Sequence, residues 1–234
     1  MTKNLPIKDI VIIGSGASGG ACAWRLSSSG ASVLVLEQGP WFDKNDYPGD
    51  SNSWEIKAKN SFDFNPNVRK LDADYEVLDN LTKEHSCGVL TASNFAIGAV
   101  LMMQMASIVG KYFDYADLIE SHHENKIDAP SGTAISIAEA AASKRQKDFK
   151  QNEVEKETIK NTRGRSLGAL QIHSARMPGR VARHELVFGG LAQTITMLHD
   201  SIDRQSFMPG VILGIKEILS RKELVVGLDK IMGI

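Results

Sequence analysis

The sequence has little cysteine, almost no net charge and no long apolar run, and each shortage excludes a class of protein. Its 234 residues include only two cysteines, Cys22 and Cys87. Two thiols, one of them inside a predicted helix, suit a reducing compartment better than a disulfide framework. The formal net charge of −1 at pH 7 leaves no electrostatic footprint for nucleic acid.

Signals for membranes, secretion and metals are also missing. The apolar run over residues 96–109 is shorter than a membrane span and contains Gln104 and Ser107. The first residues carry no signal-peptide core, so we expect a cytoplasmic protein. No Cys/His spacing would bring three or four zinc ligands together, so we expect no metal.

The first forty residues carry a dinucleotide-binding fingerprint in its proper context. A β-branched strand over residues 9–13 leads into a turn with Gly14, Gly16 and Gly19, a helix follows, and a second strand ends on Glu37. The glycines let the backbone approach a pyrophosphate at the helix N-terminus, and the acid can accept from ribose hydroxyls. An acid at this position disfavours a 2′-phosphate, so charge favours NAD or FAD over NADP.

Residues 42–86 show no convincing third and fourth parallel strands, which a doubly wound sheet normally needs. Residues 45–53 are rich in turn formers, and residues 54–79 have scattered aromatics without a sustained period. One interpretation is an irregular insertion packed by its aromatics. The interpretation that we favour is a fusion of two sequences, with its junction near residues 80–87.

The densest chemistry lies in residues 120–134, Glu-Ser-His-His-Glu-Asn-Lys-Ile-Asp-Ala-Pro-Ser-Gly-Thr-Ala. A strand is predicted before this stretch and a helix after it. Ser131, Gly132 and Thr133 open the helix, so their backbone N–H groups can bind a carboxylate or a phosphate. The alternative is a Ser-rich turn that caps the helix and binds nothing.

Three side chains before that turn can carry or transfer protons. His122 and His123 are neighbours on the predicted strand, so their side chains point to opposite faces. Imidazole titrates close to neutrality, which suits proton transfer at an anionic centre. Lys126 can add a point charge or a proton.

The rest of the chain alternates between helix and strand. Helices are predicted over residues 99–113, 133–145 and 206–219, and strands over residues 116–122, 167–176, 181–188 and 191–198. A Met-Pro-Gly-Arg turn at residues 177–180 predicts a hairpin. This order is typical of an α+β layer, a mixed sheet covered by helices on one face. His173, His184 and His199 fall on or beside strands, where packing is the expected role.

These residues resemble two families. The pattern His122-His-x-x-Lys126-x-Asp128-Ala-Pro-Ser-Gly-Thr-Ala134 resembles the signature of dihydrodipicolinate reductase, also called 4-hydroxy-tetrahydrodipicolinate reductase, and the likeness covers residues 87–231. That family reduces a cyclic dicarboxylic imine-type substrate with NADH or NADPH in lysine and diaminopimelate biosynthesis. The amino-terminal segment instead resembles the FAD-binding start of glucose–methanol–choline flavin oxidoreductases, where its glycines and acid would bind the ADP half of FAD.

The reductase resemblance implies a role for each matched position. His122 would act as the general acid/base, and Lys126 would protonate the nitrogen formed on hydride transfer. The substrate would be held by His123, Ser131, Gly132 and Thr133. The nicotinamide would lie near Thr91, Ala92, Ser93, Asn94 and Phe95.

The sequence thus predicts an α/β protein with a partial Rossmann-like nucleotide-binding segment at residues 1–86. An α+β substrate-binding and oligomerisation domain is predicted at residues 87–234. We expect NADH or NADPH as cofactor, with FAD as the alternative. The expected partners are a small dicarboxylate and further copies of the chain, a tetramer by family analogy, with neither nucleic acid nor membrane. A flavoprotein fragment and an inactive dicarboxylate-binding protein are the alternatives to the reductase.

Overall fold

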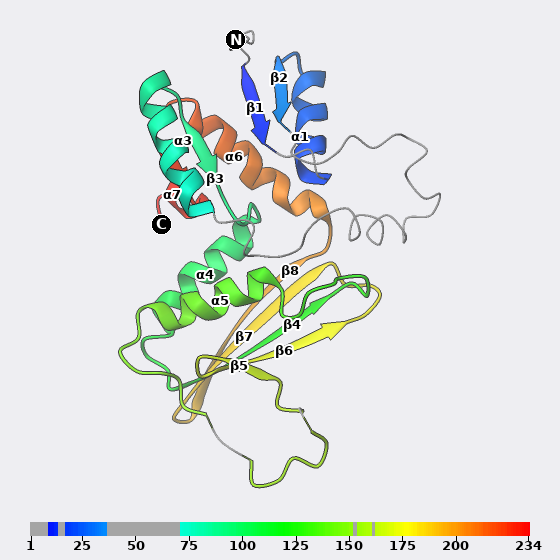
Figure 1. Ribbon diagram of the computed structural model, residues 1–234. Coiled ribbons are helices and arrows are strands. Elements are labelled where there is room, and N and C mark those ends of the chain that lie inside the picture. The colour runs from blue at the N-terminus through cyan, green and yellow to red at the C-terminus, as the bar shows by residue number, and fades with distance from the viewer. Residues whose placement is uncertain (1–8, 14–16, 37–70, 152–153, 161) are drawn as a thin grey trace. The chain divides into compact units, whose positions relative to one another are not determined.

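The computed structural model describes residues 9–13, 17–36, 71–151, 154–160 and 162–234 (Figure 1). The chain forms two compact units, residues 1–68 and 69–234. Within the described part, no helix is both long and apolar enough to cross a membrane.

The first unit contains a strand, a helix and a second strand, as predicted. β1 (Ile10–Ile13) pairs in parallel with β2 (Val33–Leu36), and α1 (Ala17–Ser28) connects them. The predicted nucleotide contact Gly19 lies in α1. Gly14, Gly16 and Glu37 lie outside the described residues.

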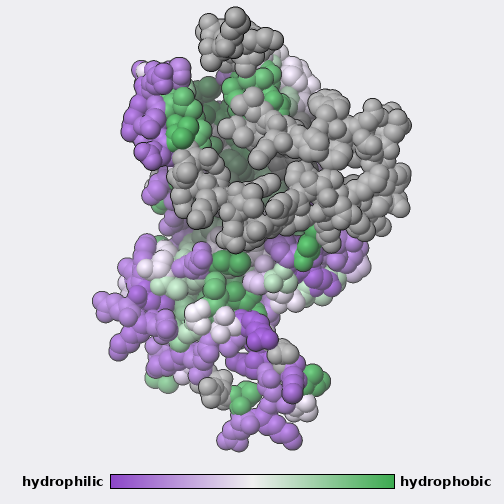
Figure 2. Space-filling model, viewed as in Figure 1, coloured by the Kyte–Doolittle hydropathy of each residue, from purple (hydrophilic) through white to green (hydrophobic). Residues whose placement is uncertain are grey.

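Helix α3 (Leu71–His85) lies in the second unit and begins within residues 54–79, where no sustained period was recognised. Its inward positions include Tyr75, Leu78 and Thr82, spaced three and four residues apart. The polar residue Thr82 occupies a fully buried position, which weakens the apolar period of this helix. Figure 2 shows hydrophilic residues over the outward side of this helix.

A five-stranded mixed sheet dominates the second unit. Its strands, in spatial order, are β5 (Arg165–Leu167), β6 (Leu170–Arg176), β4 (Tyr115–His122), β7 (Ala182–Gly190) and β8 (Gln193–Ser201). Helices α4 (Ile97–Val109) and α5 (Gly132–Ser143) cover one face (Figure 1). Met102, Ile137 and Phe188 are among the buried side chains between the helices and the sheet. The predicted sheet with helices on one face is confirmed.

The predicted hairpin at residues 177–180 is wrong, because β4 lies between β6 and β7. Leu118 of β4 pairs with Ile172 in a parallel ladder on one side and with Leu186 in an antiparallel ladder on the other. The turn signal is local and indicates only that the chain reverses. The turn instead crosses the end of β4, where the Met177 N–H donates to the His122 carbonyl at 3.0 Å.

A smaller core supports the segment that leads into α4. β3 (Val89–Thr91) pairs in parallel with β9 (Leu224–Val226), flanked by α6 (Met208–Ile218) and α7 (Leu228–Met232). Phe95 packs against this core, which includes Leu228. At Gly210 of α6, an added Cβ would lie 2.0 Å from the Phe95 carbonyl oxygen. This close approach of α6 holds the backbone at Phe95, within residues 91–96, which we call the hinge segment.

Candidate functional site

The helix-covered face of the sheet changes from apolar to polar along its length. Leu118 on β4 lies in an apolar row, whereas two residues later Glu120 pairs with His184 on β7. One row further, His122 pairs with Arg176 on β6. Glu120, His122 and His184 are all buried. The register therefore gathers ionisable groups at the end of the sheet where α5 begins.

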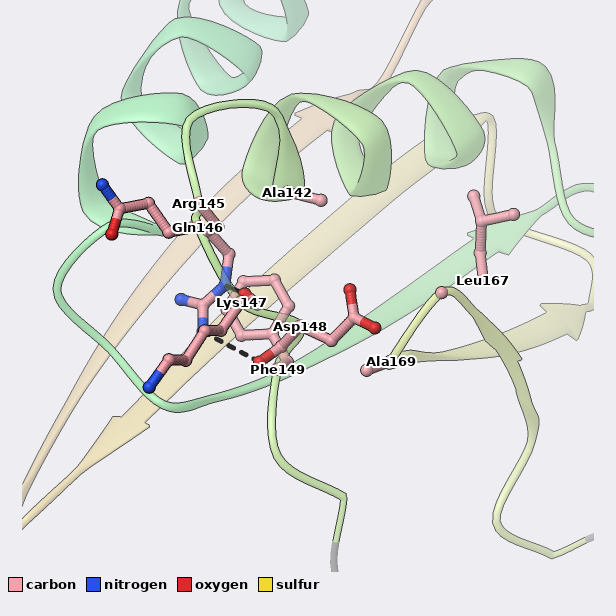
Figure 3. A pocket seen from close by; sticks show the side chains of 9 residues that line it. Ala142, Arg145, Gln146, Lys147, Asp148, Phe149, Leu167 and Ala169 are labelled. Carbon is pink, nitrogen blue, oxygen red and sulfur yellow. Dashed lines mark hydrogen bonds between the residues drawn. The ribbon is translucent and has the colours of Figure 1, made fainter.

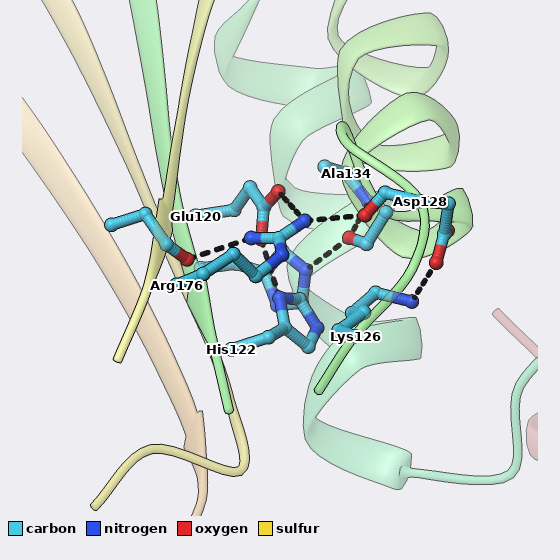
Figure 4. Close-up of polar contacts among 9 residues, drawn as sticks. Glu120, His122, Lys126, Asp128, Ala134 and Arg176 are labelled. Carbon is cyan, nitrogen blue, oxygen red and sulfur yellow. Dashed lines mark hydrogen bonds and ion pairs between the residues drawn. The ribbon is translucent and has the colours of Figure 1, made fainter. Parts of the chain in front are cut away.

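Glu120 is the centre of this polar group. Arg176 donates from Nη1 to Oε2 at 3.0 Å and from Nη2 to Oε1 at 2.9 Å, and His122 Nδ1 bonds to Oε2 (Figure 4). Burial alone would raise the pKa of the Glu120 carboxyl, but hydrogen bonds from His122, Arg176 and Ser174 outweigh it and lower the pKa to about 2. The carboxyl group is therefore ionised at neutral pH.

Arg176 also ties the strand to the loop that follows β4. Its Nη2 donates to the Asp128 carbonyl at 2.6 Å. In the same loop, Lys126 Nζ donates to Asp128 Oδ1 at 2.6 Å, and Figure 4 shows the two side chains facing each other. Burial opposes ionisation of Asp128, yet the bond from Lys126 and its charge give this carboxyl a lowered pKa. An ammonium and its counter-ion thus lie on the loop beside His122.

The start of α5 is held by a buried side-chain network. Ser131 is the N-cap: its Oγ accepts from the Ala134 N–H at 3.1 Å and lies 3.1 Å from His184 Nε2. The His184 ring meets the His122 ring edge-on, with centroids 5.3 Å apart. Burial, followed by the charge of His122, lowers the pKa of His184 to about 4, so this imidazole is neutral at pH 7.

Gly132, the first residue of α5, faces open space. An added Cβ there would meet no atom of the described residues within 4 Å, and its φ is not positive. By contrast, a Cβ on Gly110 would lie 2.1 Å from the Ala141 carbonyl oxygen. Packing therefore requires glycine at 110 but not at 132. The first N–H groups of a helix have no partner within it, so an anion can approach them here.

The hinge segment is bonded directly to α5. Asn94 Nδ2 donates to Thr133 Oγ1 at 3.2 Å, and Asn94 Oδ1 accepts from the Ala96 N–H at 2.8 Å. Ser93 and Asn94 line a cavity of about 210 Å³ that Gly227–Asp229 also border. Within the described part of the chain, the buried Thr91 hydroxyl has no hydrogen-bond partner. One predicted cofactor residue therefore contacts one predicted substrate residue.

A larger cavity, of about 470 Å³, lies elsewhere, between residues 142–149 and 167–169 (Figure 3). Arg145 lines it, but its guanidinium donates to the carbonyls of Gly110, Phe113 and Asp148 and stacks on the Phe149 ring at 3.8 Å. Because these contacts occupy its guanidinium and hold the end of α4, Arg145 has few free N–H groups with which to bind an anion. The buried cluster of Glu120, His122 and His184 lies elsewhere, at the start of α5.

The structure brings together most of the predicted catalytic and substrate residues. His122, Lys126 and Ser131 belong to connected polar groups, while His123 lies just past the end of β4 and is half-buried. Their roles stay predictions. Sequence reasoning missed Glu120, Arg176 and His184, because the pairing of β4 with β6 and β7 that joins them has no local signal. Strand alternation could have indicated only that His184 shares a face with Leu186.

Comparison with known proteins identifies the family of the chain. Residues 98–232 match the family model of the dihydrodipicolinate reductase C-terminus, and residues 12–74 match that of an NAD(P)-binding Rossmann-like domain. The 4-hydroxy-tetrahydrodipicolinate reductase of Syntrophomonas wolfei is 47% identical over 161 residues, covering 69% of this chain and 60% of that protein. The Streptococcus uberis enzyme is 45% identical over 159 residues, covering 68% and 62%.

A solved structure is also similar over nearly the whole chain. It is a dipicolinate-bound dihydrodipicolinate reductase from Paenisporosarcina sp. TG-14, with a TM-score of 0.72 and 30% identity, covering 96% of this chain and 99% of that one. The chain spans about three fifths of the length of the two curated relatives, 60% and 62%. With more than half of its residues matched by one family model, the chain belongs to the dihydrodipicolinate reductase family.

Proposed function

We propose that this protein reduces 4-hydroxy-tetrahydrodipicolinate to tetrahydrodipicolinate with NADH or NADPH, a step of lysine and diaminopimelate biosynthesis. The observation that carries the proposal is the open N-terminus of α5 beside His122 and Lys126, in a chain of this family. A dianionic ring needs cationic and N–H partners, and this end of the sheet offers both. We assign nucleotide binding to residues 1–86, and substrate binding and oligomerisation to residues 87–234.

The substrate roles follow from the hydrogen-bonding groups that each residue has available. The backbone N–H groups of Gly132 and Thr133 bind one carboxylate, and His123 contacts the substrate from the strand end. The Ser131 hydroxyl is engaged as the N-cap, so Ser131 contributes by positioning those N–H groups. Ligand binding at the helix start leaves the cap intact.

The proton roles belong to His122 and Lys126. His122 acts as the general acid/base, and Lys126 donates a proton to the ring nitrogen after hydride transfer. Since Lys126 is bonded to Asp128, it exchanges this partner for the substrate. Its side chain is long and unbranched, so a rotamer change is enough.

The hinge fits a nicotinamide. Ser93 and Asn94 line a cavity, and the Thr91 hydroxyl lacks a partner among the described residues. Ala92 and Phe95 pack into the smaller core and hold this segment in place. NADH or NADPH supplies the hydride when bound.

Four measurements test the function, its alternatives and the oligomeric state. Calorimetry with NADH, NADPH and FAD identifies the nucleotide; the match of residues 12–74 to an NAD(P)-binding model favours the first two. An active reductase consumes NADH or NADPH when given freshly condensed pyruvate and aspartate semialdehyde. A protein that only binds dicarboxylates would instead be stabilised by pyridine-2,6-dicarboxylate without turnover. Sedimentation would test the expected homotetramer.

Replacing Gly132 by alanine should weaken dicarboxylate binding without harming the fold. The methyl group meets nothing within the described part of the chain, but it occupies the approach to the helix N–H groups. We expect the Kd for pyridine-2,6-dicarboxylate to rise about tenfold, equivalent to about 1.4 kcal/mol. The melting temperature should stay level or rise slightly, because alanine is better than glycine in a helix by about 0.5–1 kcal/mol.

Gly110→Ala is the contrasting variant. Its methyl group would collide with the Ala141 carbonyl, so thermal stability should fall. Gly132→Ala with unchanged affinity would remove the α5 N-terminus from the substrate site.

A further inference from the structure

We infer that Glu120 is a positioning residue that holds His122 in a single tautomer and stabilises the proton that His122 accepts at Nε2. This role deepens the proposed function and rests on His122 acting as its acid/base. It concerns a residue that touches neither substrate nor cofactor. Glu120 acts through the imidazole to which it is bonded.

The tautomer follows from the bonds to Glu120. Its side chain is 0% exposed, and both of its oxygens are engaged by Arg176 and His122. An ionised carboxylate can only accept hydrogen bonds. The bonded Nδ1 of His122 must therefore carry the hydrogen. In the neutral ring, Nε2 is then the unprotonated nitrogen, free to take a proton from a bound molecule and to return it.

The charges around His122 explain why a negatively charged side chain is needed beside its ring. Arg176 approaches from β6 and Lys126 from the following loop, both positive. Asp128 pairs with Lys126, and Glu120 pairs with Arg176. Imidazoles among the described residues of this region include His123, the next residue, His184 on β7, and His199, which pairs with His184 on β8.

Glu120 is therefore the group that neutralises Arg176 beside the protonated ring. Burial lowers the pKa of His184 and of His199, so neither adds a charge at neutral pH. Without the negative charge, a protonated His122 would face an uncompensated guanidinium at close range. Protonation of Nε2 would then be disfavoured.

Stability alone gives no reason for this arrangement. A buried ion pair seldom stabilises a fold more than apolar residues of similar size, because desolvation offsets the attraction. Here a fully buried carboxylate is held two residues before His122, at the end of the sheet where α5 opens. Two hydrogen bonds from Arg176 fix its orientation. This placement is what a group that orients an imidazole requires.

The wild-type protein provides the first test. Nitrogen NMR of ¹⁵N-histidine-labelled protein, with His122 assigned by comparison with His122→Asn, reports the tautomer directly. We expect Nδ1 protonated and Nε2 unprotonated in the neutral ring. The opposite tautomer would overturn the inference, whatever the activity of the protein.

The second test is Glu120→Gln, which keeps the shape and removes the charge. We expect kcat to fall about ten- to a hundredfold, as when a partner that orients a functional histidine is lost. The pH–rate profile should also change, because a charge bonded to the proposed acid/base is removed. The affinity for pyridine-2,6-dicarboxylate should change less than about threefold, because the helix start is untouched.

The matched control is Glu217→Gln, which removes an exposed carboxylate from α6 and should leave kcat and the pH profile unchanged. An unchanged kcat and pH profile in folded Glu120→Gln would refute the inference. If Glu120→Gln does not fold, the wild-type tautomer decides. If the wild type consumes no NADH or NADPH, the proposed function fails, but the tautomer test still stands.

Discussion

Replacing His122 by asparagine is expected to lower kcat by about 10²–10⁴-fold, the usual contribution of a positioned acid/base. Asparagine keeps an N–H that can donate to Glu120 but has no proton to exchange. Alanine is a poorer choice, because loss of that donor at a buried carboxylate costs about 1–3 kcal/mol of stability. NADH or NADPH consumption measures the rate, and thermal denaturation checks the fold.

His173→Asn is the matched control for this variant. His173 lies on β6, where its position alternates with the buried Ile172 and faces away from the helices. Its Nε2 lies 3.7 Å from a carboxylate oxygen of Asp117. We expect near wild-type rates from His173→Asn. Wild-type rates from His122→Asn would remove His122 from the mechanism.

Acidification should lower the free energy of unfolding as soon as the pH falls below about 6.5, before most carboxyl groups become protonated. The pKa of His184 is lowered from 6.5 to about 4 in the folded protein, so between these values the unfolded chain binds a proton that the folded chain rejects. The contribution of a neutral His184 to the free energy of unfolding is therefore fully present above about pH 6.5 and is lost as the pH falls towards 4. Because lowering a pKa by one corresponds to about 1.4 kcal/mol, the loss of stability is on the order of 3 kcal/mol.

Urea unfolding at pH 7, 5.5 and 4 would measure this loss, and His184→Gln provides the comparison. Glutamine can still bond to Ser131 but does not titrate, so its stability should depend less on pH over this range. Below about pH 4.5, the unfolded chain protonates Glu120 whereas the folded chain, in which its pKa is lowered to about 2, does not, so both proteins should lose stability alike. Equal pH dependence of the wild type and His184→Gln above pH 4.5 would contradict the assignment.

Local patterns predicted much of the fold. Alternation identified the strands around His122 and His184, and Ser131 before a run of small residues identified the start of α5. The turn at residues 177–180 predicted the wrong neighbours, because a turn specifies a reversal and not the strand that lies beside it. β3 and β9 have three residues each and are far apart in the sequence, so neither produces a period.

The candidate site also contains residues that the sequence could predict and residues that it could not. Residues supplied by one stretch, from His122 to Thr133, were predicted because they are close in sequence. Glu120 lies two residues before that stretch, but its hydrogen bonds depend on Arg176, 56 residues away, and on the ring of His122. His184 meets Ser131 from 53 residues away. Such pairs form only when β4 takes the central position, which residue types alone do not specify.

That central position has a consequence for mobility. Because β4 is paired along both edges up to His122, this residue cannot fray without breaking two ladders and the bond from the Met177 N–H. Lys126, four residues later, is held mainly by one carboxylate that is itself 56% exposed. The same short signature thus joins a fixed imidazole to an ammonium whose partner can be exchanged. We therefore expect a bound ligand to change the position of the Lys126 side chain and to leave His122 in place.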